Sequence, residues 1–257
     1  MTGPIFGSMA SVAPAVRVPR NGLRAAEDKL CALVVIGVNA CGEKHSLAIE
    51  DGVRESTQSW REVLLALNAR GLKAPKLAIG DGAMGFWAAL EEIFPTTRQQ
   101  RCWVHKTANV LNCLPKRSQP KAKKMLHDIW QAETKKDAEA AFDLFIETYE
   151  PKYPKATACL LKGRQELLSF YDFPAQHWQS IRTTNPIEST FATIRHRTKP
   201  SKGCLNRPGM LHMMFKLAQC AETSWRQQRG FAHLADVIEG VGFINGVKPS
   251  TPDRAAA

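Results

Sequence analysis

The stretch 30-LCALVVIGVNACGEKHSLAIE-50 decides the fold class, because it has the pattern of two strands joined by a turn. Residues 30–38 form an apolar, β-branched run that has the length of a buried strand. Gly42 lies in the turn expected at 39–44, and residues 45–50 return as a second strand. We therefore expect a hairpin at 30–50, and other parts of the chain must supply the rest of its sheet.

The next fifty residues alternate between helix and strand patterns. We expect, in chain order, a helix at 59–70, a strand at 76–80, a helix at 85–93 and a strand at 98–104. Strands that alternate with helices on this scale indicate an α/β layer arrangement.

After residue 106 the apolar residues recur at helical spacing. They do so at Ala122, Met125, Leu126, Ile129 and Trp130, and again at Ala138, Phe142, Phe145, Ile146 and Tyr149. Residues 106–180 are therefore expected to be wholly helical. A last helix at about 208–228 should have on its inner side Leu211, Met214, Phe215, Ala218 and Trp225. This order of elements fits an α/β core that carries an all-helical insertion.

The first 28 residues differ from the rest, since they are rich in Ala, Gly, Pro and Arg and show no sustained period. We expect them to be flexible. The segment 11-SVAPAVRVPRNGL-23 contains Pro14 and Pro19, each of which lacks a backbone N–H. Such a segment is poor material for a central strand.

The chain is strongly basic, with 35 Lys and Arg against 24 Asp and Glu and a net charge of +11. This balance favours a polyanionic partner, although a generic basic protein would show it too. Two acid-poor clusters favour a nucleic-acid footprint over solvated helix faces. The first consists of Arg182, Arg195, Arg197, Lys199, Lys202 and Arg207, and the second contains Lys116, Arg117, Lys121, Lys123 and Lys124.

The sequence also bears on where the protein works. It has no run of 18 apolar residues, so no membrane span is expected. Its seven cysteines are odd in number and scattered, which is typical of reduced thiols in a cytosol rather than of a disulfide framework.

Two carboxylates could carry chemistry. Asp81 follows an expected strand at its carboxyl end, where sites gather in α/β sheets, although an Asp-Gly turn would also explain it. In 185-NPIE-188, Asn185 can be an N-cap, Pro186 the N1 residue and Glu188 the N3 residue of a capping box. Glu188 could equally present an oxygen to a metal ion.

Cys102 and His105 form a C-x2-H pair. Two ligands do not make a closed zinc site, and no second short-spaced pair supports the possible extra ligands Cys113 and His127. A packed cysteine beside a hydrogen-bonded histidine is the favoured interpretation.

Three motifs, 79-IGDGAMGFWAAL-90, 101-RCWVHKTANVL-111 and 183-TTNPIESTFATIRHRTK-199, together resemble the Mutator-type transposases of bacterial insertion sequences. The resemblance extends over about residues 28–246 and keeps the family's motif order. It implies a ribonuclease-H-like core whose Asp, Asp, Glu triad binds two divalent metal ions, Mg²⁺ or Mn²⁺. Asp81 matches the second Asp and Glu188 the Glu. Cys102 and His105 match a pair near the family's active site or target strand.

The sequence departs from the family at the first Asp, which belongs on the first, central strand. Only Asp28 and Asp51 precede Asp81, and neither occupies that place. We therefore expect a ribonuclease-H-like core that is incomplete at its first strand, in a truncated transposase. The expected parts are an unrelated leader at 1–28, core segments at 29–105 and 181–246, a helical insertion at 106–180 and a tail at 247–257.

The resemblance implies a transposase that cleaves and joins DNA, at the nucleoid in the cytoplasm, with a second copy or an intact transposase as a partner. Without the first Asp, we expect the chain to be inactive in strand cleavage and only marginally stable. One alternative is an inactive DNA-binding fragment that competes with intact transposase. Another is a metal-dependent nuclease in which a different acid replaces the missing one.

Overall fold

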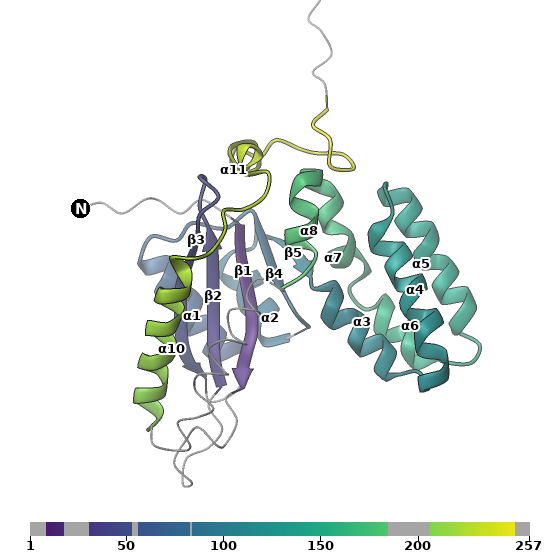
Figure 1. The fold of residues 1–257 in the computed structure, drawn as a ribbon, viewed down its shortest axis with the longest axis horizontal. Helices are drawn as coiled ribbons and strands as arrows, with labels where there is room; N and C mark the ends of the chain where they lie inside the picture. The colour runs from purple at the N-terminus through teal and green to yellow at the C-terminus, as the bar shows by residue number, and fades with distance from the viewer. Residues whose placement is uncertain (1–8, 18–30, 53–55, 83, 185–205, 250–257) are drawn as a thin grey trace, which may run out of the picture.

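The computed structural model describes residues 9–17, 31–52, 56–82, 84–184 and 206–249. It contains one sheet with helices on both faces and a group of helices beside it (Figure 1). The expectation of a mixed α/β protein with a helical block is confirmed. In the described part of the chain, no helix is long and apolar enough to cross a lipid bilayer.

The sheet has five strands in the order β3-β2-β1-β4-β5. They are β1 (Met9–Arg17), β2 (Cys31–Val38), β3 (Lys44–Gly52), β4 (Leu77–Gly80) and β5 (Arg98–Arg101). Strands β1, β2 and β3 pair antiparallel, whereas β4 runs parallel to both β1 and β5. The hairpin expected at 30–50 is therefore present as β2 and β3.

Strand β1 corrects two expectations, because it fills the central place of the sheet. Residues 9–17 are a strand and not a flexible leader, and the described sheet has a central strand that precedes the hairpin. Its register against β2 shifts between Ala13 and Val16, a segment that contains Pro14. A bulge leaves a residue out of the ladder, so the N–H that Pro14 lacks is not needed there.

The two faces of the sheet are covered by different helices. In β2, Leu33 and Val35 belong to the apolar cluster formed with α1 (Thr57–Ala69) and α2 (Met84–Ile93). Ala32, Val34 and Ile36 belong instead to the cluster formed with α10 (Arg207–Glu222). Since side chains alternate along a strand, β2 is buried on both faces, as its continuous apolar run predicts.

Helix α10 differs from its prediction in length and in its inner face. It ends at Glu222 rather than near residue 228. Its buried stripe is Met210, Met214 and Ala218, whereas Phe215, expected inside, is 41% exposed. The i, i+4, i+8 spacing that starts at Met210 places Phe215 one position around the helix from that stripe.

The block from 103 to 181 is helical, which confirms the expectation for 106–180. Its helices are α3 (Trp103–Asn112), α4 (Gln119–Gln131), α5 (Lys135–Tyr149), α6 (Pro154–Leu161), α7 (Arg164–Leu168) and α8 (Trp178–Ile181). Short 3₁₀ turns lie at Lys116–Ser118, Ser169–Asp172, Ala175–His177 and Phe231–His233, and α11 spans Leu234–Glu239. The strand expected at 98–104 ends at Arg101, because α3 already begins at Trp103.

The helical block is joined to the sheet through β5. The amide of Gln100 and the indole N–H of Trp103 both donate to the carbonyl of Leu167, at 3.1 and 2.9 Å. All three residues are buried. These bonds fix α7 against the end of β5 and so define the junction at which the candidate site lies.

Candidate active site

Asp81 lies directly after β4, at the carboxyl end of that strand, as predicted. The indole N–H of Trp87 in α2 donates to the Asp81 carbonyl at 2.8 Å, which ties the turn to the first residues of α2. The backbone N–H of Cys102 donates to the carbonyl of Gly80 at 2.7 Å. The half-buried Asp81 is therefore held between the starts of α2 and α3.

The central strand brings no carboxylate to Asp81. The parallel register pairs Ala10 with Ala78 and Ser11 with Ile79, and its continuation would set Ala13 level with Asp81. The sequence of β1, MASVAPAVR, contains no acid.

The aspartates that precede Asp81 do not replace the missing one in the described structure. Asp51 lies on the edge strand β3, paired with Ala32, two strands away from β1. Asp28 lies outside the described residues. The described strands therefore place one aspartate, Asp81, at this edge of the sheet.

The Cys102 thiol is a buried hydrogen-bonding centre with 1% exposure. The backbone N–H and the hydroxyl of Thr184 both donate to Sγ, each at 3.4 Å, and His105 also hydrogen-bonds the thiol. Burial raises the pKa of Cys102, but the hydrogen bonds from His105 and Thr184 outweigh it and lower the pKa below its ordinary value.

These contacts match the interpretation of Cys102 and His105 as a packed cysteine beside a hydrogen-bonded histidine. In the ranges that the structure describes, no three His, Cys, Asp or Glu side chains lie close enough to hold a metal ion together. Cys113 donates to the Asn109 carbonyl, and His127 packs against Trp130 with 4.4 Å between ring centroids.

Thr184 is the last described residue before the segment that carries Glu188. Thr184 bonds to the Cys102 thiol. Two residues earlier, the carbonyl of Arg182 accepts a hydrogen bond from the backbone N–H of Trp103 at 2.9 Å. The chain is thus held beside the Asp81 turn up to Thr184. Glu188 lies outside the described residues.

Arg182, expected to contact DNA, has internal partners. Its guanidinium lies over the rings of Trp130 and Phe170, at 4.9 and 5.4 Å, and donates to the carbonyls of Trp130 and Trp178. Burial lowers its pKa. These contacts account for Arg182 without a phosphate.

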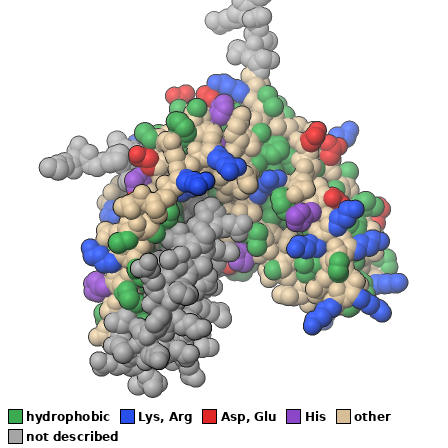
Figure 2. Space-filling view, in the orientation of Figure 1, with side chains coloured by type: hydrophobic (Ala, Val, Ile, Leu, Met, Phe, Trp, Pro, Cys, Tyr) green, Lys and Arg blue, Asp and Glu red, His purple; other side chains and the backbone are tan. Residues whose placement is uncertain are grey.

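The other basic residues divide between described and undescribed parts of the chain. Lys121, Lys123 and Lys124 are exposed on α4, and Figure 2 shows several Lys and Arg side chains on the helical block. Arg207 is the first residue of α10. The remaining expected DNA contacts, Arg195, Arg197, Lys199 and Lys202, lie outside the described residues.

Sequence reasoning missed three cations near Asp81, namely Arg101, Lys106 and Lys162. They line one cavity with Asp81 and Cys102. Arg101 and Lys106 flank the C-x2-H pair in 101-RCWVHK-106, which was the available signal. Lys162 carried no signal, because it follows the end of α6, 56 residues after Lys106, and only the fold brings them together.

The comparison with known families agrees with the three motifs. The family model described as "Transposase, Mutator family" matches residues 14–228. The chain belongs to the Mutator family of transposases.

Individual relatives are named as transposases as well. The chain is 55% identical over 222 residues to the transposase of insertion sequence element IST2 from Acidithiobacillus ferrooxidans, a match that covers 86% of the chain and 75% of that relative. It is 47% identical over 224 residues to the transposase of IS6120 from Mycolicibacterium smegmatis, with 87% and 69% covered. It is 27% identical over 207 residues to the transposase of ISRM5 from Rhizobium meliloti, with 80% and 52% covered.

Proposed function

We propose that the chain is a transposase core that acts on DNA through a divalent-metal site built on Asp81 and Glu188. The observation that carries this proposal is the place of Asp81 at the end of β4, next to the anchored Thr184. The resemblance implied a first strand at the centre of the sheet followed by a hairpin, and the described sheet has both. This arrangement supports a ribonuclease-H-like core.

The donor types suit Mg²⁺ or Mn²⁺. Such ions prefer carboxylate oxygen ligands, and Asp81 is half-buried at a sheet edge beside Gly82, which leaves room for a ligand. Ions held by Asp81 and Glu188 would supply activation of the attacking oxygen and stabilisation of the leaving oxygen at a phosphodiester. The reaction would be attack by water at the transposon end, then attack of the freed 3′-hydroxyl on target DNA. Among the described residues the fit is partial, because β1 offers no acid beside Asp81.

The missing acid leads to a test by restoration. Continued by two residues, the parallel register of β1 and β4 sets Val12 level with Gly80 and Ala13 level with Asp81. We expect the unaltered chain to cleave DNA poorly and either Val12→Asp or Ala13→Asp to raise Mn²⁺-dependent nicking. A gain of at least about 100-fold is expected, because a bound metal contributes several kcal/mol to the transition state. The measurement is nicking of a supercoiled plasmid with and without EDTA.

The controls combine the restored acid with Asp81→Asn or Glu188→Gln. Both combinations should return nicking to the background level, whereas Lys73→Gln, in the loop before β4, should leave it unchanged. If neither restored acid produces nicking that depends on Asp81, the proposed site is wrong. Nicking by the unaltered chain that Asp81→Ala abolishes would instead select a nuclease that uses a different third acid.

A second candidate function is DNA binding without chemistry, as a competitor of intact transposase. The acid-free β1 strand together with the exposed lysines of α4 favours it. Salt-dependent DNA binding that survives Asp81→Ala and Glu188→Ala, with no nicking by any variant, would select this function.

A further inference from the structure

A small cavity of about 190 Å³ lies beside Asp81, where β4 and β5 meet the helical block. Its lining includes Asp81, Arg101, Cys102, Lys106, Asn109 and Lys162. Among the described residues that line it, three cations face one carboxylate. This excess of positive charge next to a candidate metal ligand requires a physical explanation.

Arg101 is the last residue of β5, and its side chain reaches the Asp81 turn. Its Nη1 lies 4.0 Å from the position that a Cβ would take at Gly82. Its Cδ and Nε pass within 3.1 Å of the corresponding point at Gly163, which has a φ of +90°. Gly163 therefore provides both the turn and the space in which Arg101 lies. The guanidinium is also 5.8 Å from the centre of the Trp87 ring.

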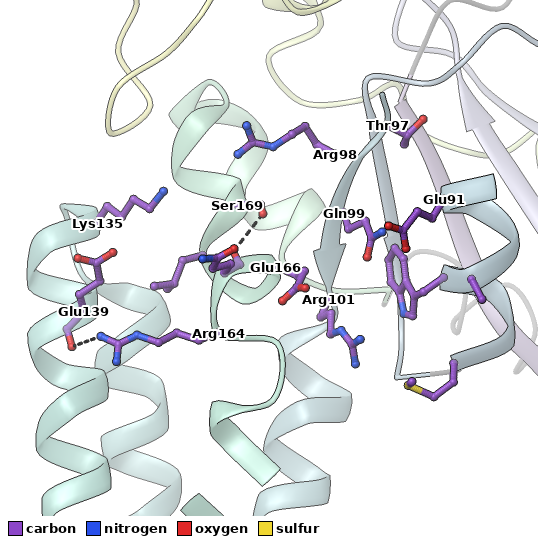
Figure 3. A pocket seen from close by; sticks show the side chains of 15 residues that line it. Glu91, Thr97, Arg98, Gln99, Arg101, Lys135, Glu139, Arg164, Glu166 and Ser169 are labelled. Carbon is purple, nitrogen blue, oxygen red and sulfur yellow. Dashed lines mark hydrogen bonds between the residues drawn. The ribbon is translucent and has the colours of Figure 1, made fainter. Parts of the chain in front are cut away.

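Arg101 differs from its neighbours because it forms no ion pair in the described part of the chain, although the Oε2 of Glu166 lies 3.3 Å from the same Cβ position at Gly163. Arg98 forms an ion pair with Asp172, and Arg164 pairs with Asp143 at 2.6 Å. Figure 3 shows the guanidinium of Arg101 pointing away from both of these arginines, although all three line one larger cleft. In the described part of the chain, no carboxylate forms an ion pair with Arg101, and its buried Nε has no hydrogen-bond partner.

The lysines complete the basic side of the cavity. Lys106 is 8% exposed, and its ammonium donates to the carbonyls of Cys159, at 2.8 Å, and Lys162. It thereby satisfies carbonyls at the end of α6 and fixes the backbone of Lys162. The side chain of Lys162 is exposed at the rim of the cavity.

A phosphate group matches this set of donors. The guanidinium fork pairs well with phosphate oxygens, and a lysine ammonium adds a point charge. In a partly enclosed recess these charges are screened less by salt than on an open surface. The larger cleft is a weaker candidate, because Arg98 and Arg164 already have carboxylate partners there.

We propose that Arg101 and Lys162, with Lys106 behind them, bind one backbone phosphate of DNA next to the phosphodiester presented to Asp81. This inference rests on the proposed function, because it says which backbone phosphate of DNA is held next to the phosphodiester at Asp81. Arg101 and Lys162 would be positioning residues that hold the strand and do not hold metal.

The salt dependence of DNA binding tests this proposal without any cleavage. We would measure binding of a fluorescent 30-base-pair duplex by anisotropy, in EDTA, between 50 and 200 mM salt. Each lost phosphate contact reduces the slope of log K against log salt by about 0.9. Arg101→Gln and Lys162→Gln should each lower the slope by that amount, and the double variant by about twice as much.

Two controls separate a lost contact from a lost fold. Arg101→Lys should recover most of the slope, because it keeps the charge. Lys73→Gln removes one exposed charge before β4 and should keep the parental slope. If the parent binds the duplex but Arg101→Gln and Lys162→Gln keep its slope, the phosphate site is wrong while the proposed function stands. A parent that does not bind the duplex would contradict both.

Discussion

Cys102 connects three segments that meet at the site. Its backbone N–H bonds to Gly80 at the end of β4, its thiol accepts from Thr184, and His105 bonds the same sulfur from α3. The sequence indicated a packed cysteine with a hydrogen-bonded histidine, but not the third partner. Thr184 is 82 residues away, so no local pattern could indicate the contact.

The contacts of Cys102 predict that substitutions there reduce stability, and that Cys102→Ala reduces it more than Cys102→Ser. Cys102→Ala should lower the free energy of unfolding by about 1–3 kcal/mol, since it leaves a small cavity and buried donors without their acceptor. Cys102→Ser keeps an acceptor and should cost less. Urea denaturation measures both.

The matched control is Cys113→Ala, which changes an exposed cysteine at the end of the same helix. It should alter the free energy of unfolding by no more than about 0.5 kcal/mol. If Cys102→Ala were equally neutral, the sulfur would not be holding these segments together.

Among the elements, β1 shows where sequence reasoning failed. Two prolines and a weak apolar period argued against a strand, yet β2 already required one. Its side chains Leu33 and Ala32 are buried on opposite faces, and β3 pairs with only one of its two edges. A strand buried on both faces needs a partner on the other edge, and Met9–Arg17 supplies it with Pro14 inside the register shift.

The placement of β1 predicts a large loss of stability for one proline change and a small effect for another. Ser11 pairs with Ile36 on one side and Ile79 on the other, so Ser11→Pro removes an N–H from a central strand. It should cost about 3 kcal/mol or more. Pro14→Ala, at the irregular part of the register, should change stability by less than about 1 kcal/mol.

Urea unfolding followed by circular dichroism compares these two variants with the parent. A Ser11→Pro protein as stable as the parent would show that residues 9–17 do not pair within the sheet.

At the scale of the whole molecule, local patterns predicted the layers well. The apolar spacing in α4 and α5 is repeated in their buried residues, such as Leu126, Ile129, Phe142 and Phe145. These helices pack with neighbours in the chain, so their pattern already carries the necessary information. The arrangement around Asp81 was less predictable, because Arg101, Lys106 and Lys162 come from different elements.

The same long-range assembly underlies the proposed metal site, in which two carboxylates 107 positions apart in sequence would share ions. Titration with Mn²⁺, followed by electron paramagnetic resonance of the free ion, tests this directly in the parent and in single variants. Asp81→Asn and Glu188→Gln should each weaken Mn²⁺ binding at least about tenfold, since even changes behind metal ligands cost that much. Asp51→Asn, on the edge strand β3, should bind as the parent does. Parental Mn²⁺ affinity in either Asp81→Asn or Glu188→Gln would contradict a site shared by these two residues.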